Sequence, residues 1–153
     1  MSHIRLGSLA GYVFEGPFTL QGWRPPAKPG VYCIMYKPKP EKAPDKYAVI
    51  YVGQNMDMSK EGLPKNHDQY HCWVERAGGS PWKLFVAVYY PWADPLASNP
   101  RQLISLQNDL IAHYDPHCNP VKFDKGWQGK WVGEYTSSLT GPLSKRDANE
   151  KPI

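Results

Sequence analysis

Two apolar runs decide the fold of this chain: Gly30-Val31-Tyr32-Cys33-Ile34-Met35-Tyr36 and Tyr47-Ala48-Val49-Ile50-Tyr51-Val52-Gly53. Both runs are rich in β-branched and aromatic residues, which favour β-strands. The connector between them, residues 38–45, contains three prolines and therefore predicts a projecting loop rather than a helix. The sequence predicts two sequential antiparallel strands, over residues 30–37 and 46–53.

Three further elements are predicted downstream of the two strands. Asn66 is a candidate cap for a helix over residues 67–77, which the two glycines at 78 and 79 would end. A third strand is predicted over residues 83–90. A second helix begins at Asn99-Pro100, and one apolar face recurs along it at Leu103, Leu106, Leu110, Ile111 and Tyr114. The order β-β-α-β-α indicates the α+β class.

Composition limits the cellular setting and the class of partner. The chain has 153 residues, enough for one domain with a core, and a formal net charge of +4, which permits a polyanionic partner. No segment approaches the roughly 20 apolar residues that span a bilayer. The N-terminus lacks an apolar core of signal-peptide length, and three cysteines without CxxC spacing favour free thiols in a reducing compartment. We therefore expect a cytoplasmic protein without a membrane segment.

The two runs contain the tripeptides Gly30-Val31-Tyr32 and Tyr51-Val52-Gly53, and the second helix is followed by Pro116 and Asn119. This set resembles the GIY-YIG nuclease family over residues 30–120. The resemblance implies a small three-stranded antiparallel sheet flanked by helices. Residues 1–29 would be an N-terminal extension packing on this domain, and residues 121–153 a Trp-rich C-terminal extension with a frayed tail, within a single domain overall.

The resemblance also implies Mg²⁺-dependent phosphodiester hydrolysis of DNA. In the family, a helix glutamate holds the metal, a tyrosine hydroxyl handles the attacking water and an arginine steadies the phosphate. Carried over, it assigns Gly30 and Gly53 to the structural motif. It assigns the catalytic positions to Tyr32, Tyr51, His67, His71, Gln107 and Asn119.

Two of these positions depart from the family pattern. Gln107 stands where the metal-binding glutamate is expected, and a neutral amide is a poor Mg²⁺ ligand. His67 stands at the arginine position, where an imidazole supplies no permanent bidentate cation. We therefore expect magnesium to bind weakly or not at all, and hydrolysis to be impaired or absent. Gln107→Glu is nearly isosteric and is expected to restore cleavage if the rest of the site is intact.

Several interpretations stay open at the sequence level, including whether the chain is an enzyme. Gln107 is compatible with natural loss of catalysis in a nucleic-acid-binding module, with an engineered inactive variant, or with a protein-interaction module. His67 and His71, spaced i and i+4, could form half of a zinc site with His117 as a scattered further histidine. If the chain cuts specific sites in DNA, a homodimer is expected, because a single-metal site hydrolyses one strand at a time.

The C-terminal third is the candidate nucleic-acid surface. Lysines are interleaved there with tryptophans. The more ordinary role of these tryptophans is to cover an open sheet face, and the alternative is a platform on which bases stack. The residues concerned are Lys122, Lys125, Trp127, Lys130 and Trp131.

Overall fold

The two apolar runs form neighbouring antiparallel strands at the centre of the sheet, as predicted. The computed structural model describes residues 3–7, 11–91 and 100–119, and the backbone of residues 131–135. Strand β3 (Gly30–Tyr36) pairs with β4 (Lys46–Asn55) on one side and with β5 (Phe85–Tyr89) on the other. β3 is thus the middle strand of the three that the sequence predicted, and it is buried on both faces.

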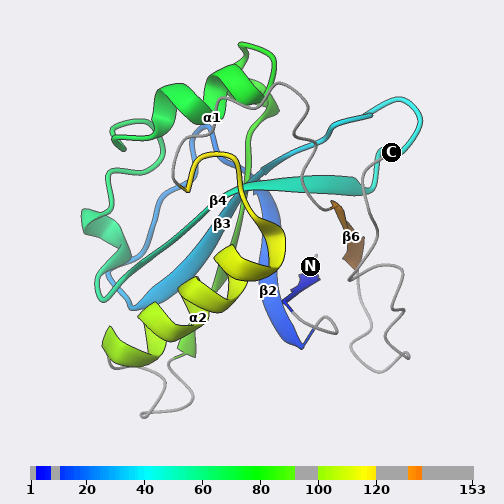
Figure 1. Cartoon of the computed structure of the whole chain (residues 1–153). Helices are drawn as coiled ribbons and strands as arrows, with labels where there is room; N and C mark the ends of the chain where they lie inside the picture. Colours follow the sequence, from blue (N-terminus) through cyan, green and yellow to red (C-terminus); the bar gives the residue numbers. More distant parts are fainter. Residues whose placement is uncertain (1–2, 8–10, 92–99, 120–130, 136–153) are drawn as a thin grey trace.

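The sheet is larger than the sequence predicted, so the expectation of a three-stranded sheet flanked by helices is wrong. Strands β1 (His3–Leu6), β2 (Tyr12–Thr19) and β6 (Trp131–Tyr135) extend it on both sides. The described strands follow the antiparallel order β1-β2-β5-β3-β4-β6, and β6 closes the ring by pairing with β1 and β4 (Figure 1). The described residues therefore form a curled, closed sheet with two α-helices.

The three additional strands have weak sequence signals for identifiable reasons. β1 has only four residues, too few to establish an alternating pattern. In β2 the pair Gly16-Pro17 interrupts the apolar pattern, and the register against β5 shifts between Glu15 and Phe18. Such a bulge accommodates glycine and proline, which are unfavourable in a regular strand.

Two core clusters lie on the two faces of the central strands. On one face, Val31, Cys33 and Met35 of β3 pack with the apolar side of helix α2 (Pro100–Tyr114). On the other face, Tyr32 and Ile34 pack with residues that include Trp73 of helix α1 (Tyr70–Arg76). Figure 1 shows α1 above and α2 below the strands in this view. The alternation along β3 thus decides which side chains face which helix.

The two helices differ in how well the sequence predicted them. α2 has the predicted length, and its predicted apolar face is largely buried, while the proposed cap Asn99 lies outside the described residues. α1 is shorter than predicted: it begins at Tyr70, so His67 lies in the preceding turn rather than on the helix. It ends before Gly78 and Gly79, which have positive φ values of 91° and 92°. Neither helix is long and apolar enough to cross a membrane.

Two of the three cysteines are bonded to each other, so the expectation of free thiols is wrong for them. Cys72 of α1 forms a disulfide with Cys118, which follows α2, across a sequence separation of 46 residues. Cys33 is a free thiol, as predicted, and it is buried. Spacing could not reveal the pair, because the fold alone brings α1 next to the segment that follows α2.

Candidate functional site

The two motif tripeptides face each other across the β3–β4 pair. Tyr32 lies directly opposite Gly53 in the register, so its side chain and the missing side chain of Gly53 share one face. A Cβ atom at Gly53 would contact the Tyr32 hydroxyl and lie 2.6 Å from Tyr32 Cε1, closer than atoms can approach. Glycine is therefore required here because the Tyr32 ring occupies the space above it.

Tyr51 lies on the same face as Tyr32. It is opposite Ile34 in the register, and its ring centroid is 6.0 Å from that of Tyr32. His67 packs edge-on against Tyr51 with ring centroids 5.0 Å apart, and Trp73 stacks behind His67 at 4.7 Å. The structure thus brings together three residues that the sequence placed in one site.

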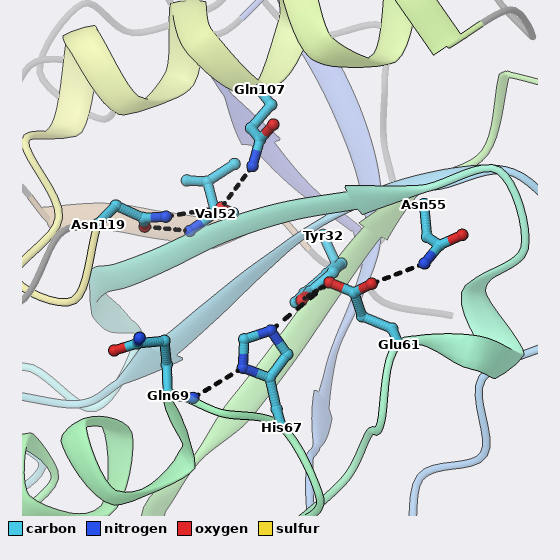
Figure 2. A network of polar contacts seen from close by, with 8 residues as sticks. All are labelled: Tyr32, Val52, Asn55, Glu61, His67, Gln69, Gln107 and Asn119. Atoms are coloured by element: carbon cyan, nitrogen blue, oxygen red, sulfur yellow. Dashed lines mark hydrogen bonds and ion pairs between the residues drawn. The ribbon is translucent and has the colours of Figure 1, made fainter.

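A carboxylate that sequence reasoning missed lies at the centre of this group. The Tyr32 hydroxyl donates to Glu61 Oε1 at 2.6 Å, and Asn55 Nδ2 donates to Glu61 Oε2 at 2.8 Å (Figure 2). His67 Nε2 lies 3.6 Å from Glu61 Oε1. We call Tyr32, Tyr51, Glu61 and His67 the motif cluster.

Local contacts hold the donors of the motif cluster in orientation. Asn55 Oδ1 accepts the backbone N–H of Asp57, which turns its Nδ2 towards Glu61. His67 Nδ1 accepts the backbone N–H of Gln69 at 2.9 Å. In its neutral form the imidazole therefore carries its proton on Nε2, the nitrogen that faces Glu61.

The cluster contains one ionised carboxylate and two neutral phenols at neutral pH. Burial opposes ionisation of Glu61, but the neighbouring His67 imidazole and the hydrogen bonds from Asn55 and Tyr32 outweigh it and lower the pKa of the carboxyl. Burial and then the negative charge of Glu61 raise the pKa of the Tyr32 and Tyr51 hydroxyls. Both hydroxyls can therefore donate hydrogen bonds, but neither is a ready base.

Gln107 and Asn119 meet at the outer edge of β4 rather than in the motif cluster. The Asn119 side chain accepts the Val52 N–H at 2.6 Å and donates to the Val52 carbonyl at 2.9 Å. Gln107 Nε2 donates to the same carbonyl at 3.2 Å. In Figure 2 the β4 ribbon runs between these two amides and the Glu61–His67 pair. Asn119 thus fixes local strand structure, and Gln107 acts there as a donor.

The remaining predicted site residues are placed as follows. His71 lies on α1 and is exposed, apart from the partly buried His67. Gly30 is buried, and a Cβ atom there would lie 3.0 Å from Met58 Cγ. The backbone of Trp131 begins β6. Lys122, Lys125, Trp127 and Lys130 lie outside the described residues.

The side chains that could act as metal ligands do not fit the magnesium ion that the resemblance implies. Gln107 is neutral, and its amide nitrogen is used by Val52. Both oxygens of Glu61 already accept hydrogen bonds, and the Nε2 proton of neutral His67 faces Glu61. Within the described parts of the chain, no three His, Cys, Asp or Glu side chains are grouped to hold a metal. The zinc alternative from His67 and His71 also lacks the helical spacing on which it depended.

The signal for Glu61 was present in the sequence but non-specific. Glu61 follows the second tripeptide in a polar segment, and an acidic residue in a polar loop usually faces solvent. Its partner Tyr32 is 29 residues earlier, so only the fold brings them together.

Comparisons of the chain with models of known protein families, with curated proteins and with solved structures found no match.

Proposed function

We propose that this chain is a nucleic-acid-binding module related to the GIY-YIG nucleases, in which metal-dependent hydrolysis is weak or absent. The observation that carries the proposal is the convergence of Tyr32, Tyr51 and His67 on one face of the sheet. These three residues come from three separate parts of the chain. Tyr32 and Tyr51 match the two tyrosines of the family pattern, and His67 stands at its arginine position. DNA is the expected partner.

The chemistry of the cluster supports contact with a phosphodiester. Tyr51 is partly exposed and remains a neutral phenol, so its hydroxyl can donate to a phosphate oxygen. Glu61 keeps its negative charge, which hydrogen bonds from the uncharged donors Tyr32 and Asn55 stabilise but do not neutralise, so phosphate contact here needs nearby cations. Two exposed lysines lie close to Glu61 and His67 in the sequence. Lys60 ends a 3-10 helix (Met58–Lys60) directly before Glu61, Lys65 lies two residues before His67, and both could neutralise neighbouring phosphates.

The bonding of Gln107 supports the absence of hydrolysis. Attack on a phosphodiester needs charge neutralisation at the reacting phosphate, which the family achieves with a carboxylate-bound metal. Here the side chain at that position is a neutral hydrogen-bond donor to Val52. The position therefore contributes to strand structure instead of supplying an anionic ligand.

A titration of labelled duplex and single-stranded DNA at two salt concentrations tests the proposal. We expect affinity to fall as salt rises, because phosphate contacts release counterions. The same samples are incubated with Mg²⁺ or Mn²⁺ and should remain uncut. Absence of binding, or binding insensitive to salt, would overturn the binding proposal. Efficient cutting would instead make this chain an active nuclease.

Tyr51→Phe tests whether the motif cluster is the contact. The substitution removes only the hydroxyl and keeps the ring packed against His67 and Trp73. A hydrogen bond to a charged group contributes about 1.5–3 kcal/mol, so DNA affinity should fall about tenfold or more. Tyr12→Phe, an exposed tyrosine on β2, is the matched control and should bind like the unmodified protein. Equal affinity for both variants would remove Tyr51 from the contact surface.

A further inference from the structure

The disulfide between Cys72 and Cys118 joins the two structural elements that flank the motif cluster. On one side, Cys72 precedes Trp73, a fully buried residue whose ring centroid lies 5.2 Å from that of Tyr51 and 4.7 Å from that of His67. The position of α1 therefore determines how Trp73 supports the cluster.

On the other side, Cys118 belongs to a segment that runs along the outer edge of β4. Its backbone N–H donates to the Ile50 carbonyl at 2.9 Å, and the next residue, Asn119, holds both backbone groups of Val52. The residue between these two anchored positions is Tyr51. The disulfide thus connects α1, whose Trp73 packs against Tyr51, to the segment that binds the edge of β4 on either side of Tyr51.

Helix α1 is short and is held by tertiary contacts of its side chains: Tyr70 and Val74 pack against the core cluster that contains Trp73, and Arg76 interacts with Tyr36 of β3. It contains seven residues, and no side chain caps its N-terminus. Isolated helices of this length are marginal in water, so their stability depends on tertiary anchors. The buried Trp73 and the disulfide at Cys72 are two such anchors on adjacent residues.

We infer that Cys72–Cys118 is a thiol–disulfide exchange site that controls the order of α1 and, through it, the motif cluster. The co-reactant is a small thiol or dithiol. Its thiolate attacks Sγ of Cys72, because Cys72 is partly exposed whereas Cys118 is 1% exposed. A mixed disulfide forms at Cys72 and Cys118 leaves as a thiolate.

The second half of the exchange returns both cysteines to the reduced state. A second thiolate attacks the small-molecule sulfur of the mixed disulfide, and Cys72 leaves as a thiolate. The two protein sulfurs take up two electrons and then two protons, and the small thiol is oxidised to its disulfide. The oxidised small-molecule disulfide reverses the reaction.

Hydrogen exchange of the full chain tests the inference without any nucleic acid. Excess dithiothreitol is added under native conditions, and alkylation followed by mass measurement reports how many thiols have been released. We expect amides of residues 70–76 to exchange about tenfold faster in the reduced protein, with residues 103–110 unchanged. Resistance of the disulfide to native reduction, or unchanged exchange in α1 after reduction, would overturn the inference.

Two variants separate this site from other effects of the reductant. Cys72→Ser should show fast exchange in α1 with or without dithiothreitol. Cys33→Ser removes the buried free thiol and should respond to dithiothreitol like the unmodified protein.

The consequence for DNA binding rests on the proposed function. Reduction should weaken DNA binding about tenfold if α1 positions Tyr51 and His67 for contact. If neither redox state binds DNA, the proposed function fails, while the exchange of α1 still decides the inference about the disulfide. Fast exchange in α1 with undiminished DNA affinity would overturn control of the motif cluster by the disulfide.

Discussion

At the scale of single residues, the pair of Tyr32 and Gly53 explains why a tyrosine and a glycine occur together in the two tripeptides. The ring of Tyr32 lies over Gly53 in the register, and any larger residue at position 53 would overlap it. The glycine is thus required by a side chain 21 residues earlier in the chain. With no side chain at Gly53, the Tyr32 ring can lie over the strand, where its hydroxyl donates a hydrogen bond to Glu61.

Gly53→Ala should therefore destabilise the fold through steric overlap with Tyr32. Overpacking a filled core typically costs about 1–3 kcal/mol of unfolding free energy, which urea denaturation can measure. In a Tyr32→Leu background the overlap is removed, so the same substitution should cost clearly less. Equal effects of Gly53→Ala in the two backgrounds would contradict this account of the glycine.

Glu61 should make stability depend on pH in the acidic range. Its pKa is lowered below the ordinary 4.5, so the unfolded chain binds a proton before the folded chain does. The stabilisation is fully present above the unfolded value and is lost as pH falls through the folded value. The unfolding free energy of the unmodified protein should therefore fall more steeply below pH 4.5 than that of Glu61→Gln.

At neutral pH Glu61→Gln should itself be less stable by about 1–3 kcal/mol, because its amide nitrogen would face the donor Nδ2 of Asn55. Glu41→Gln, an exposed substitution in the connector between β3 and β4, is the matched control. It should change neither the neutral-pH stability nor the steepness of the acidic slope. Parallel acidic slopes for the unmodified protein and Glu61→Gln would show that the carboxylate is not stabilised by the network.

At the scale of elements, α2 and β4 are joined at Val52 by side-chain amides. Gln107 and Asn119 both donate to the Val52 carbonyl, and Asn119 also accepts the Val52 N–H. A glutamate at position 107 would bring a carboxylate towards the carbonyl without a donor. Gln107→Glu is nearly isosteric, but it would remove this hydrogen-bond donor to Val52.

Gln107→Glu should lower the unfolding free energy by about 1 kcal/mol and should not create Mg²⁺-dependent cleavage. Asn108→Asp makes the same chemical change at the next, exposed position of α2 and should be close to neutral. Thermal denaturation and an assay with labelled DNA measure the two effects. Unchanged stability together with new cleavage would show that position 107 still serves as a metal-ligand position.

At the scale of the whole molecule, long uninterrupted patterns were predictable and non-local contacts were not. The apolar runs of β3 and β4 and the recurring leucines of α2 are strong local signals. The four residues of β1 are too few for a local signal, and the bulge at Gly16-Pro17 interrupts the pattern of β2. The sequence therefore predicted the central strands and missed those that close the ring.

The candidate site divides in the same way. Tyr32, Tyr51 and His67 were predictable because a known pattern of motifs includes their positions. Glu61 and the Cys72–Cys118 pair depend on contacts across 29 and 46 residues, which no local pattern records. Position 107 was identified, but its role as a donor to Val52 required the geometry of the strand edge.

The proposed binding surface lies at one end of the β3–β4 hairpin. Lys60 and Lys65 are exposed in the segment that follows β4, whereas Lys42 is exposed in the connector between β3 and β4. The register of the two strands places this segment and the connector at opposite ends of the pair. The molecule carries a net charge of +4, so a general attraction to DNA would not depend on which lysine is removed. Binding at the motif cluster would depend on which lysine is removed.

The salt dependence of duplex DNA affinity in lysine variants therefore shows whether DNA binds at the motif cluster. Each neutralised phosphate contributes about 0.9 to the slope of log affinity against log salt. We expect the double variant Lys60→Ala, Lys65→Ala to lower this slope by about 2, and Lys42→Ala to leave it nearly unchanged. A slope that is the same for the unmodified protein and the double variant, or one that Lys42→Ala lowers equally, would contradict binding at the motif cluster.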